Sequence, residues 1–178
     1  MRDNKSSDLL SRRIVLLKGE INDASSYEII DKLLQLECEN PTEDITLYVN
    51  SPGGLVTAGL AIYDVMQTVK PDVITVCVGQ ACSMGAIILA GGAPEKRFAL
   101  PNSRMLIHQP SGKAFGTASE IETSALEIVR LKHQLNSIIA HHTGKSIEEV
   151  SIDTLKDYYL TPEAALQYHL IDKIIYPS

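Results

Sequence analysis

Ser83 is the residue of this chain whose position best suits a nucleophile. It follows an apolar, β-branched run at residues 73–79, typical of a buried strand, and precedes a wholly apolar, helix-like run at residues 84–90. A hydroxyl at the first turn of a helix lies beside free backbone N–H groups, which stabilise a developing oxyanion. Residues 81–85 also keep the small-x-Ser-x-Gly spacing of a nucleophile elbow. Alone, these residues predict either a nucleophile or an ordinary N-cap serine.

A serine nucleophile needs a general base and an acid that orients the base. His108 is the best candidate for the base because it ends a predicted strand, although a core histidine is the alternative. The other four histidines fall on predicted helices: His133, His141, His142 and His169. Spacing alone does not choose the acid among Asp153, Asp157 and Asp172.

The elements around Ser83 predict parallel βαβ units. A strand predicted at residues 44–49 ends in an Asn-Ser-Pro-Gly-Gly turn at residues 50–54, whose glycines permit positive φ and close backbone approach. A helix predicted at residues 56–69 then leads to the strand before Ser83. Because chemistry collects at the carboxyl ends of such strands, we expect the glycine turn and the Ser83 corner to lie side by side.

The remaining elements are read from periodicity and caps. We predict strands at residues 14–17, 96–100, 104–109 and 172–176, and helices after Asn22 or Asp23, after Ser146 and after Thr161. Residues 157–160 are interpreted as a connecting segment. The longest helix begins at a capping box, Thr117 with Glu120, and runs to about His142 before Gly144. A helix of this length commonly projects and packs on another subunit; a long core helix is the alternative.

Composition excludes several classes of function. The chain has 178 residues, enough for one domain, and a formal charge of −6, which argues against a nucleic-acid partner. No apolar stretch is long enough to cross a membrane and no signal-peptide core is evident, so we expect a cytoplasmic protein. The three cysteines suggest neither a disulfide framework nor a metal site. Cys82 is a rival nucleophile, but Ser83 holds the better elbow position.

Five segments together resemble the proteolytic subunit of the ATP-dependent Clp protease, the ClpP family. They lie at residues 50–54, 79–85, 101–110, 159–164 and 168–172, in order and at compatible spacing over nearly the whole chain. The resemblance implies a crotonase-like α/β fold, a spiral of βαβ units with a projecting long handle helix. It also implies a single serine peptidase domain over residues 1–178.

The resemblance assigns roles to individual residues. It implies that Ser83 is the nucleophile, His108 the general base and Asp157 the triad acid, with the amides of Gly54 and Met84 as the oxyanion hole. Two other readings stay open: a non-catalytic ClpP-like subunit of a mixed ring, and a crotonase-fold acyl-CoA enzyme. The first is disfavoured because all three triad positions are filled, and the second because such enzymes typically use carboxylates.

The resemblance also implies an assembly and partners. Residues 112–143 look like the handle through which two heptameric rings stack, as a homo- or hetero-oligomer that encloses a chamber for unfolded protein substrates. An ATP-dependent Clp unfoldase uses the ATP, so the chain itself needs no cofactor and no metal. The unfoldase would dock in an apolar cleft lined by Thr46, Tyr48, Val76, Val78, Phe98 and Leu100; core packing is the alternative for all but Tyr48.

Three departures from the family pattern bear on these expectations. The N-terminal segment before the matching part is short, at residues 1–8, so we expect the chain to depend on a partner for controlled access. Leu155 and Lys156 stand where the family commonly has an acidic residue and an arginine, so we expect rings that separate more readily. His169 replaces a glycine that would end a helix.

Overall fold

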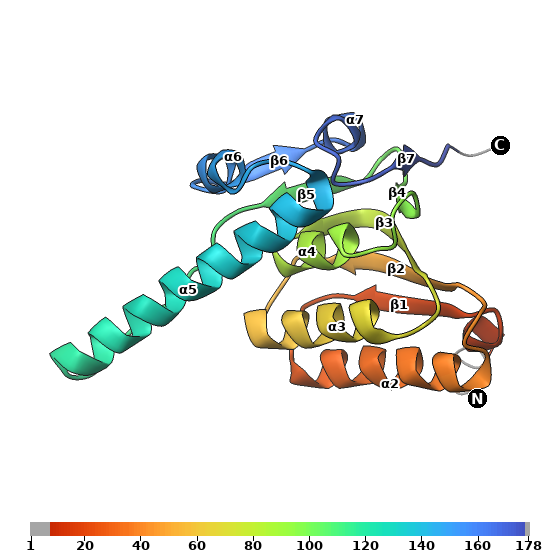
Figure 1. Cartoon of the computed structure of the whole chain (residues 1–178), viewed down its shortest axis with the longest axis horizontal. Coiled ribbons are helices and arrows are strands. Elements are labelled where there is room, and N and C mark those ends of the chain that lie inside the picture. Colours follow the sequence, from red (N-terminus) through yellow and green to blue (C-terminus); the bar gives the residue numbers. More distant parts are fainter. Residues whose placement is uncertain (1–7, 177–178) are drawn as a thin grey trace.

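The computed structural model describes residues 8–176, so the short N-terminal segment discussed above lies almost wholly outside the described residues. A sheet runs through the centre with helices packed along it, and one long helix projects from the body (Figure 1). In chain order the elements are β1 Ile14–Lys18, α2 Asp23–Glu39, β2 Ile45–Ser51, α3 Val56–Thr68, β3 Val73–Cys82, α4 Met84–Ala90, β4 Arg97–Ala99, β5 Arg104–Ile107, α5 Ala118–Thr143, α6 Ile147–Asp153, β6 Tyr158–Leu160, α7 Pro162–Gln167 and β7 Lys173–Ile174.

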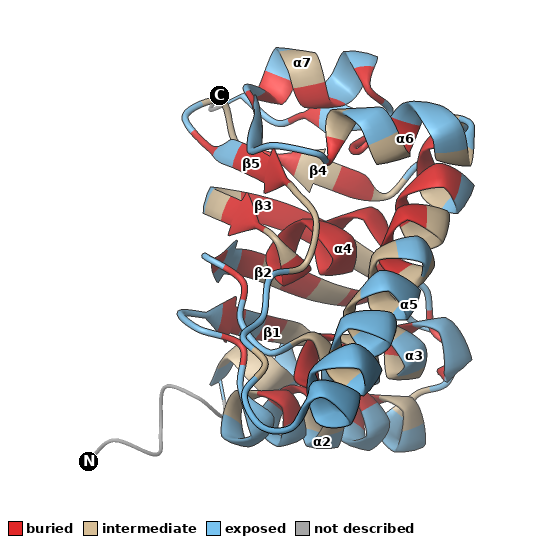
Figure 2. Cartoon of the chain, turned by 90° about the vertical axis from the view of Figure 1, so that its left-hand side faces the viewer, coloured by how far each residue is buried: buried red, intermediate tan, exposed pale blue. Residues whose placement is uncertain are grey.

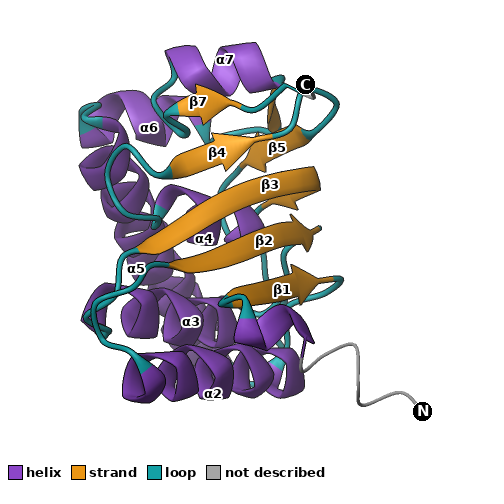
Figure 3. Cartoon of the chain, turned by 90° about the vertical axis from the view of Figure 1, so that its right-hand side faces the viewer, coloured by secondary structure: helices purple, strands orange, loops and turns teal. Residues whose placement is uncertain are grey.

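The sheet is mostly parallel, which confirms the predicted α/β class and its βαβ units. Within residues 8–176 it has seven strands, and β1, β2, β3, β4 and β7 form one continuous parallel order. Strand β5 pairs in parallel with the last part of β3, and β6 pairs with β5 in the antiparallel direction. Figure 3 shows strands β1 to β4 in front, with helices α3 and α4 on their far side.

Burial alternates along the strands, so the two faces of the sheet differ in exposure. Along β2, Leu47 and Val49 are buried while Tyr48 between them is half-buried. Side chains of a strand point alternately to opposite faces, so Leu47 and Val49 point to the helix-covered face and Tyr48 points to the other face. The helix-covered face therefore forms the core, and the other face stays partly open.

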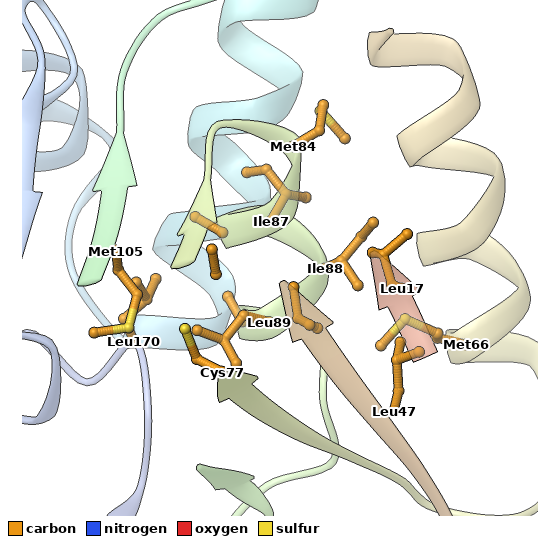
Figure 4. Close-up of a cluster of buried hydrophobic side chains, with 14 of the residues drawn as sticks. Leu17, Leu47, Met66, Cys77, Met84, Ile87, Ile88, Leu89, Met105 and Leu170 are labelled. Carbon is orange, nitrogen blue, oxygen red and sulfur yellow. The ribbon is translucent and has the colours of Figure 1, made fainter. Parts of the chain in front are cut away.

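Helix α4 is the centre of the core, and every one of its residues is buried. Figure 4 shows Ile87 and Ile88 of this helix among side chains from β1, β2 and α3, including Leu17 and Leu47. Full burial of one such side chain contributes roughly 1.5–3 kcal/mol, so moving α4 would expose a large part of the core. The residue immediately before α4, Ser83, is consequently fixed in space.

Helix α5 begins and ends as the caps predict. Thr117 and Glu120 form the capping box, and Gly144 ends the helix in the left-handed conformation with φ of 71°. The half near Gly144 is buried against the body, whereas the opposite half is exposed (Figure 2) and points away from the body (Figure 1). The helix is thus a core helix at one end and a projecting helix at the other.

Two predicted elements need correction. The interpretation of residues 157–160 as a connecting segment is wrong, because Tyr158–Leu160 forms β6 against β5. A segment of three residues is too short to show an alternating pattern, so the strand is recognised only from its pairing with β5. Strand β3 extends to Cys82, past the predicted end at Gly79, because a positive φ of 75° at Gly79 accommodates a register shift against β2.

Smaller differences concern histidines. Strand β5 ends at Ile107, so His108 is the first residue beyond the strand. His169 lies just after α7 with φ of 61°, in the left-handed conformation that glycine adopts more easily.

No helix within the described part of the chain is both long and apolar enough to cross a lipid bilayer.

Candidate active site

Ser83 occupies a strained corner between β3 and α4. Its backbone has φ of 54° and ψ of −121°, a region rarely adopted by residues other than glycine, at a cost of roughly 1–3 kcal/mol. Backbone hydrogen bonds hold the corner: Ser83 N donates to Leu106 O at 2.9 Å, and Ser83 O accepts from Ala86 N at 2.9 Å. The side chain makes no N-cap hydrogen bond, so the ordinary capping role does not describe this serine.

The glycine turn lies directly against this corner, side by side as expected from the strand order. Gly53 has φ of 97°, and a Cβ added there would lie 2.7 Å from Cβ of Ser83 and 3.2 Å from N of Met84. Within the turn, Ser51 Oγ accepts from Gly53 N at 3.0 Å and donates to Gly19 O at 2.6 Å. Position 53 therefore admits only glycine if Ser83 is to keep its place.

Two backbone N–H groups near Ser83 have no hydrogen-bond partner among the described residues. Ile21 N donates to Gly53 O and Leu55 N donates to Ile21 O, each at 2.8 Å, so this bridge bypasses the N–H of Gly54. Met84 is the first residue of α4, where a helix has no internal acceptor for the N–H. Among residues 8–176 no hydrogen bond uses either N–H group. The N–H of Met84 directly follows Ser83 in the chain, and that of Gly54 directly follows Gly53, which lies against Ser83.

The β5–β6 ladder brings His108 and Asp157 together. Ile107 pairs with Tyr158, so the next residues along the antiparallel strands, His108 and Asp157, face each other. His108 Nδ1 lies 3.0 Å from Asp157 Oδ1, where Nδ1–H can donate to the carboxylate. Nε2 is then the nitrogen left to exchange a proton with Ser83.

The other two candidate acids are engaged elsewhere. Asp153 accepts a hydrogen bond from the Tyr168 hydroxyl at 2.9 Å. Asp172 pairs with Arg97 at 2.6 Å. Burial alone would raise the pKa of Asp172, but the hydrogen bonds and charge of Arg97 outweigh it and lower the pKa below its usual value. Of the three carboxylates, Asp157 is the one that reaches His108.

Ser83 and His108 line one small cavity of about 20 Å³, room for about one water molecule. Its other walls are mostly apolar and come from α3, α4, β5, α5 and the segment after β5: Val56, Met84, Ile87, Ile107, Pro110, Leu135 and Ile139. No hydrogen bond joins Ser83 to His108 in the described range. Catalytic hydrogen bonds are often long before substrate binds, so the shared cavity is the relevant observation.

Comparison with known families identifies the chain. A family profile described as Clp protease matches residues 2–178. The chain belongs to the Clp protease family. Membership confirms the resemblance carried by the five sequence segments and agrees with the crotonase-like α/β fold. Within this Clp protease fold, Ser83 and His108 directly follow the carboxyl ends of the parallel strands β3 and β5.

Cys82 does not compete well with Ser83 in this Clp protease chain. The thiol is buried, at 5% exposure, and its Sγ lies 3.7 Å from Gln80 Oε1. Burial raises the pKa of the Cys82 thiol, with the charge of Arg104 acting in the opposite direction. A raised pKa keeps the reactive thiolate scarce at neutral pH.

In the part of the chain that the structure describes, no group of three or more potential ligands could hold a metal ion.

The six residues expected to form the unfoldase cleft lie across neighbouring strands. In the parallel ladders Tyr48 stands beside Val76, and Val76 stands beside Phe98. Tyr48 and Phe98 are half-buried, as are Thr46, Val78 and Leu100. Val76 needs correction as a contact residue, because it is buried at 3% exposure between its neighbours. Leu16, which is not among the six, pairs with Tyr48 and is 38% exposed.

Proposed function

We propose that this chain is a serine endopeptidase, the proteolytic subunit of an ATP-dependent Clp protease. One observation carries the proposal: His108, held by Asp157 through Nδ1, lines the same cavity as the strained, uncapped Ser83. Residues 1–178 act as one peptidase domain, with residues 112–143 as its handle. No cofactor or metal takes part in the reaction.

In the first half of the reaction, Ser83 Oγ attacks the carbonyl carbon of a peptide bond and passes its proton to His108 Nε2. The N–H groups of Gly54 and Met84 donate to the resulting oxyanion, which each such donor stabilises by about 2.7–4 kcal/mol. Asp157 holds the imidazole in the required tautomer and stabilises its charged form. The intermediate collapses when the amine leaves with the proton from His108, and an acyl-serine remains.

In the second half, water replaces the amine. His108 Nε2 accepts a proton from the water as its oxygen attacks the acyl carbon, and the same N–H groups hold the second oxyanion. The proton then returns to Ser83 Oγ as the carboxylic acid leaves. One water is consumed for each peptide bond, and the enzyme regains its starting state.

The proposed substrate is unfolded protein, degraded inside a chamber of two stacked heptameric rings. The exposed half of α5 supports ring stacking, because Leu126 and Val129 there are 66% and 63% exposed and would be buried by a second copy. Whether the partners are identical or different subunits does not change this surface. Leu155, 51% exposed, and the exposed Lys156 offer no matched ion pair, so we propose that the rings separate more readily.

The proposed partner is an ATP-driven Clp unfoldase that docks on the open face of the sheet. Tyr48, which pairs with Leu16 on one side and Val76 on the other, supports this site because partly exposed aromatic side chains are typical anchors of protein interfaces. The unfoldase would supply both the ATP hydrolysis and the unfolded chain. Alone, the protein should cleave short peptides poorly and folded proteins not at all.

A serine-directed fluorophosphonate tests the catalytic proposal against a non-catalytic ring subunit and an acyl-CoA enzyme. We expect covalent labelling at Ser83, detected as a mass increase on the peptide that contains it, and no labelling of Ser83→Ala. A Cys82→Ala variant is the matched control for the neighbouring position and should label normally. An unlabelled wild-type chain that also hydrolyses no peptide would overturn the proposed activity.

A further inference from the structure

Two hydrogen bonds beyond the β5–β6 ladder tie the segment that carries His108 to the loop that carries Asp157. Gln109 N donates to Thr154 O at 2.8 Å, and Gln109 Nε2 donates to Leu155 O at 2.9 Å. The backbone and the side chain of one residue thus clamp the loop between α6 and β6. This clamp sits immediately beside the proposed catalytic pair.

Thr154 is itself anchored to the long helix α5. It is fully buried, and its hydroxyl lies 2.8 Å from Val150 O and 3.1 Å from Asn136 Oδ1, so these two acceptors share its one proton. Asn136 is 2% exposed, and its Nδ2 donates to Ser151 Oγ at 3.1 Å. The Asn136 side chain therefore contacts two hydroxyls: its Nδ2 contacts Ser151 on α6, and its Oδ1 contacts Thr154 at the C-cap of α6.

A buried amide at this place is not what packing alone would select. Its neighbours on α5, Leu135 and Ile139, are buried apolar residues that line the cavity shared by Ser83 and His108. Leaving a buried polar group unbonded costs about 1–3 kcal/mol, whereas an apolar side chain of similar size carries no such risk. What the amide adds is a fixed direction for the loop.

Asp157 needs such an anchor because little else holds it. Its side chain is 57% exposed, and across residues 8–176 its carboxylate has no hydrogen-bond partner besides His108. Its position therefore depends on the backbone of the loop between Thr154 and β6. A displacement of about 1 Å at a catalytic group can cost on the order of 100-fold in rate.

We infer that Asn136, Thr154 and Gln109 are positioning residues, which hold the Asp157 carboxylate in hydrogen-bonding range of His108 Nδ1. The inference rests on the proposed function, since it assigns these residues to the geometry of that catalytic pair. They touch neither substrate nor reacting atoms. They act through Asp157 alone, which makes the inference separable from a general contribution to stability.

The test measures kcat and KM for an activated ester, with which slow variants remain measurable, in the assembled protein. Gln109→Met, Asn136→Leu and Thr154→Val keep side-chain size but remove the side-chain hydrogen bonds. We expect each to lower kcat by about 10- to 100-fold with KM unchanged. Thr154→Ser, which keeps the hydroxyl, should restore most of the wild-type kcat.

Asp157→Asn provides the background that separates positioning from stability. If the three residues act through the carboxylate, each substitution should lower kcat by less than about twofold once Asp157→Asn is present. Thr143→Val is the matched control, because Thr143 is a buried threonine whose hydroxyl likewise bonds a carbonyl four residues earlier, at Ile139. It should lower thermal stability without changing kcat.

Each outcome has a distinct meaning. Unchanged kcat in the three variants, or an equal loss of kcat with and without Asp157→Asn, would overturn the positioning role. A wild-type chain that fails to label and fails to hydrolyse the ester would instead overturn the proposed function. If Asn136→Leu and Thr154→Val do not fold, Gln109→Met decides the question, because its side-chain hydrogen bond lies at the surface.

Discussion

The two halves of α5 differ in what they leave to other molecules. Near its C-terminal end, Leu135 and Ile139 are buried at 6% and 2% exposure and form a wall of the Ser83 cavity. Toward its N-terminal end, Leu126 and Val129 are mostly exposed and contact no core. One chain therefore contains every group that the proposed chemistry needs, whereas the proposed assembly surface is buried only when a second copy binds. Substitutions in the two regions should have separable effects.

The largest expected effect lies in the catalytic centre. Ser83→Ala and His108→Ala should each lower kcat for peptide hydrolysis by on the order of a million-fold, and the double variant should lose little more because the two groups act as a unit. Sedimentation should show the same assembly for all three proteins. Additive losses of kcat would contradict the pairing, and a changed assembly would contradict the separation of the two regions.

A smaller effect is expected at the exposed half of α5. Leu126→Glu combined with Val129→Glu should dissociate the stacked rings, because each apolar side chain contributes roughly 1.5–3 kcal/mol when buried and a carboxylate resists burial. Glu122→Gln, on the same exposed stretch, is the matched control and should leave assembly intact. The melting temperature of the separated chain should stay close to that of the control. Light scattering that shows unchanged assembly would move the stacking surface elsewhere.

On the open face of the sheet, Tyr48→Ala should separate partner docking from chemistry. Loss of an aromatic anchor typically costs 2 kcal/mol or more, so we expect about a 30-fold loss in the affinity of the unfoldase. The chain alone should hydrolyse a short peptide at the wild-type rate. Degradation of a folded substrate, with unfoldase and ATP, should fall at limiting unfoldase. Undiminished degradation would place docking at another surface.

The smallest effect concerns the buried end of α5, where His142 approaches Tyr63 at 2.8 Å. Burial, with the nearby charges of His141 and Arg97, lowers the pKa of His142 from 6.5 to about 4. Between these pH values the unfolded chain binds a proton that the folded chain does not, so the free energy of unfolding falls as pH drops from about 6.5 to 4. Allowing for solvent that still reaches the ring, we expect a loss of about 1–2 kcal/mol. Urea unfolding of His142→Gln should lack this component, and an identical pH dependence would contradict it.

Local signals in the sequence were sufficient for the presence and order of the elements that carry Ser83, although not for the end of β3. A β-branched run, a pair of glycines and an apolar helix have fixed backbone preferences, so the corner and the adjacent turn could be predicted from neighbouring residues alone. The caps of α5 at Thr117 and Gly144 are equally local. The roles of Ser83, His108 and Asp157 remain predictions, although the geometry around them is favourable.

Long-range pairing accounts for what the sequence could not show. Spacing left three candidate acids because β6 has three residues and no alternating pattern. Once Ile107 is known to pair with Tyr158, the register alone selects Asp157 as the residue opposite His108. The burial of Val76 and the anchor at Asn136 likewise depend on neighbours distant in the sequence, which no local pattern specifies.

The register between β3 and β5 determines to which face of the sheet the His108 side chain points. Cys82 pairs with Leu106, so the strand that leads to Ser83 and the strand that leads to His108 run in fixed register. A slip of one residue would turn every side chain of β5 to the opposite face of the sheet. A single-residue insertion in the turn before Arg104 would thus either be absorbed by that turn or remove the imidazole from the cavity. The alignment of Ser83 with His108 is therefore all-or-none, not graded.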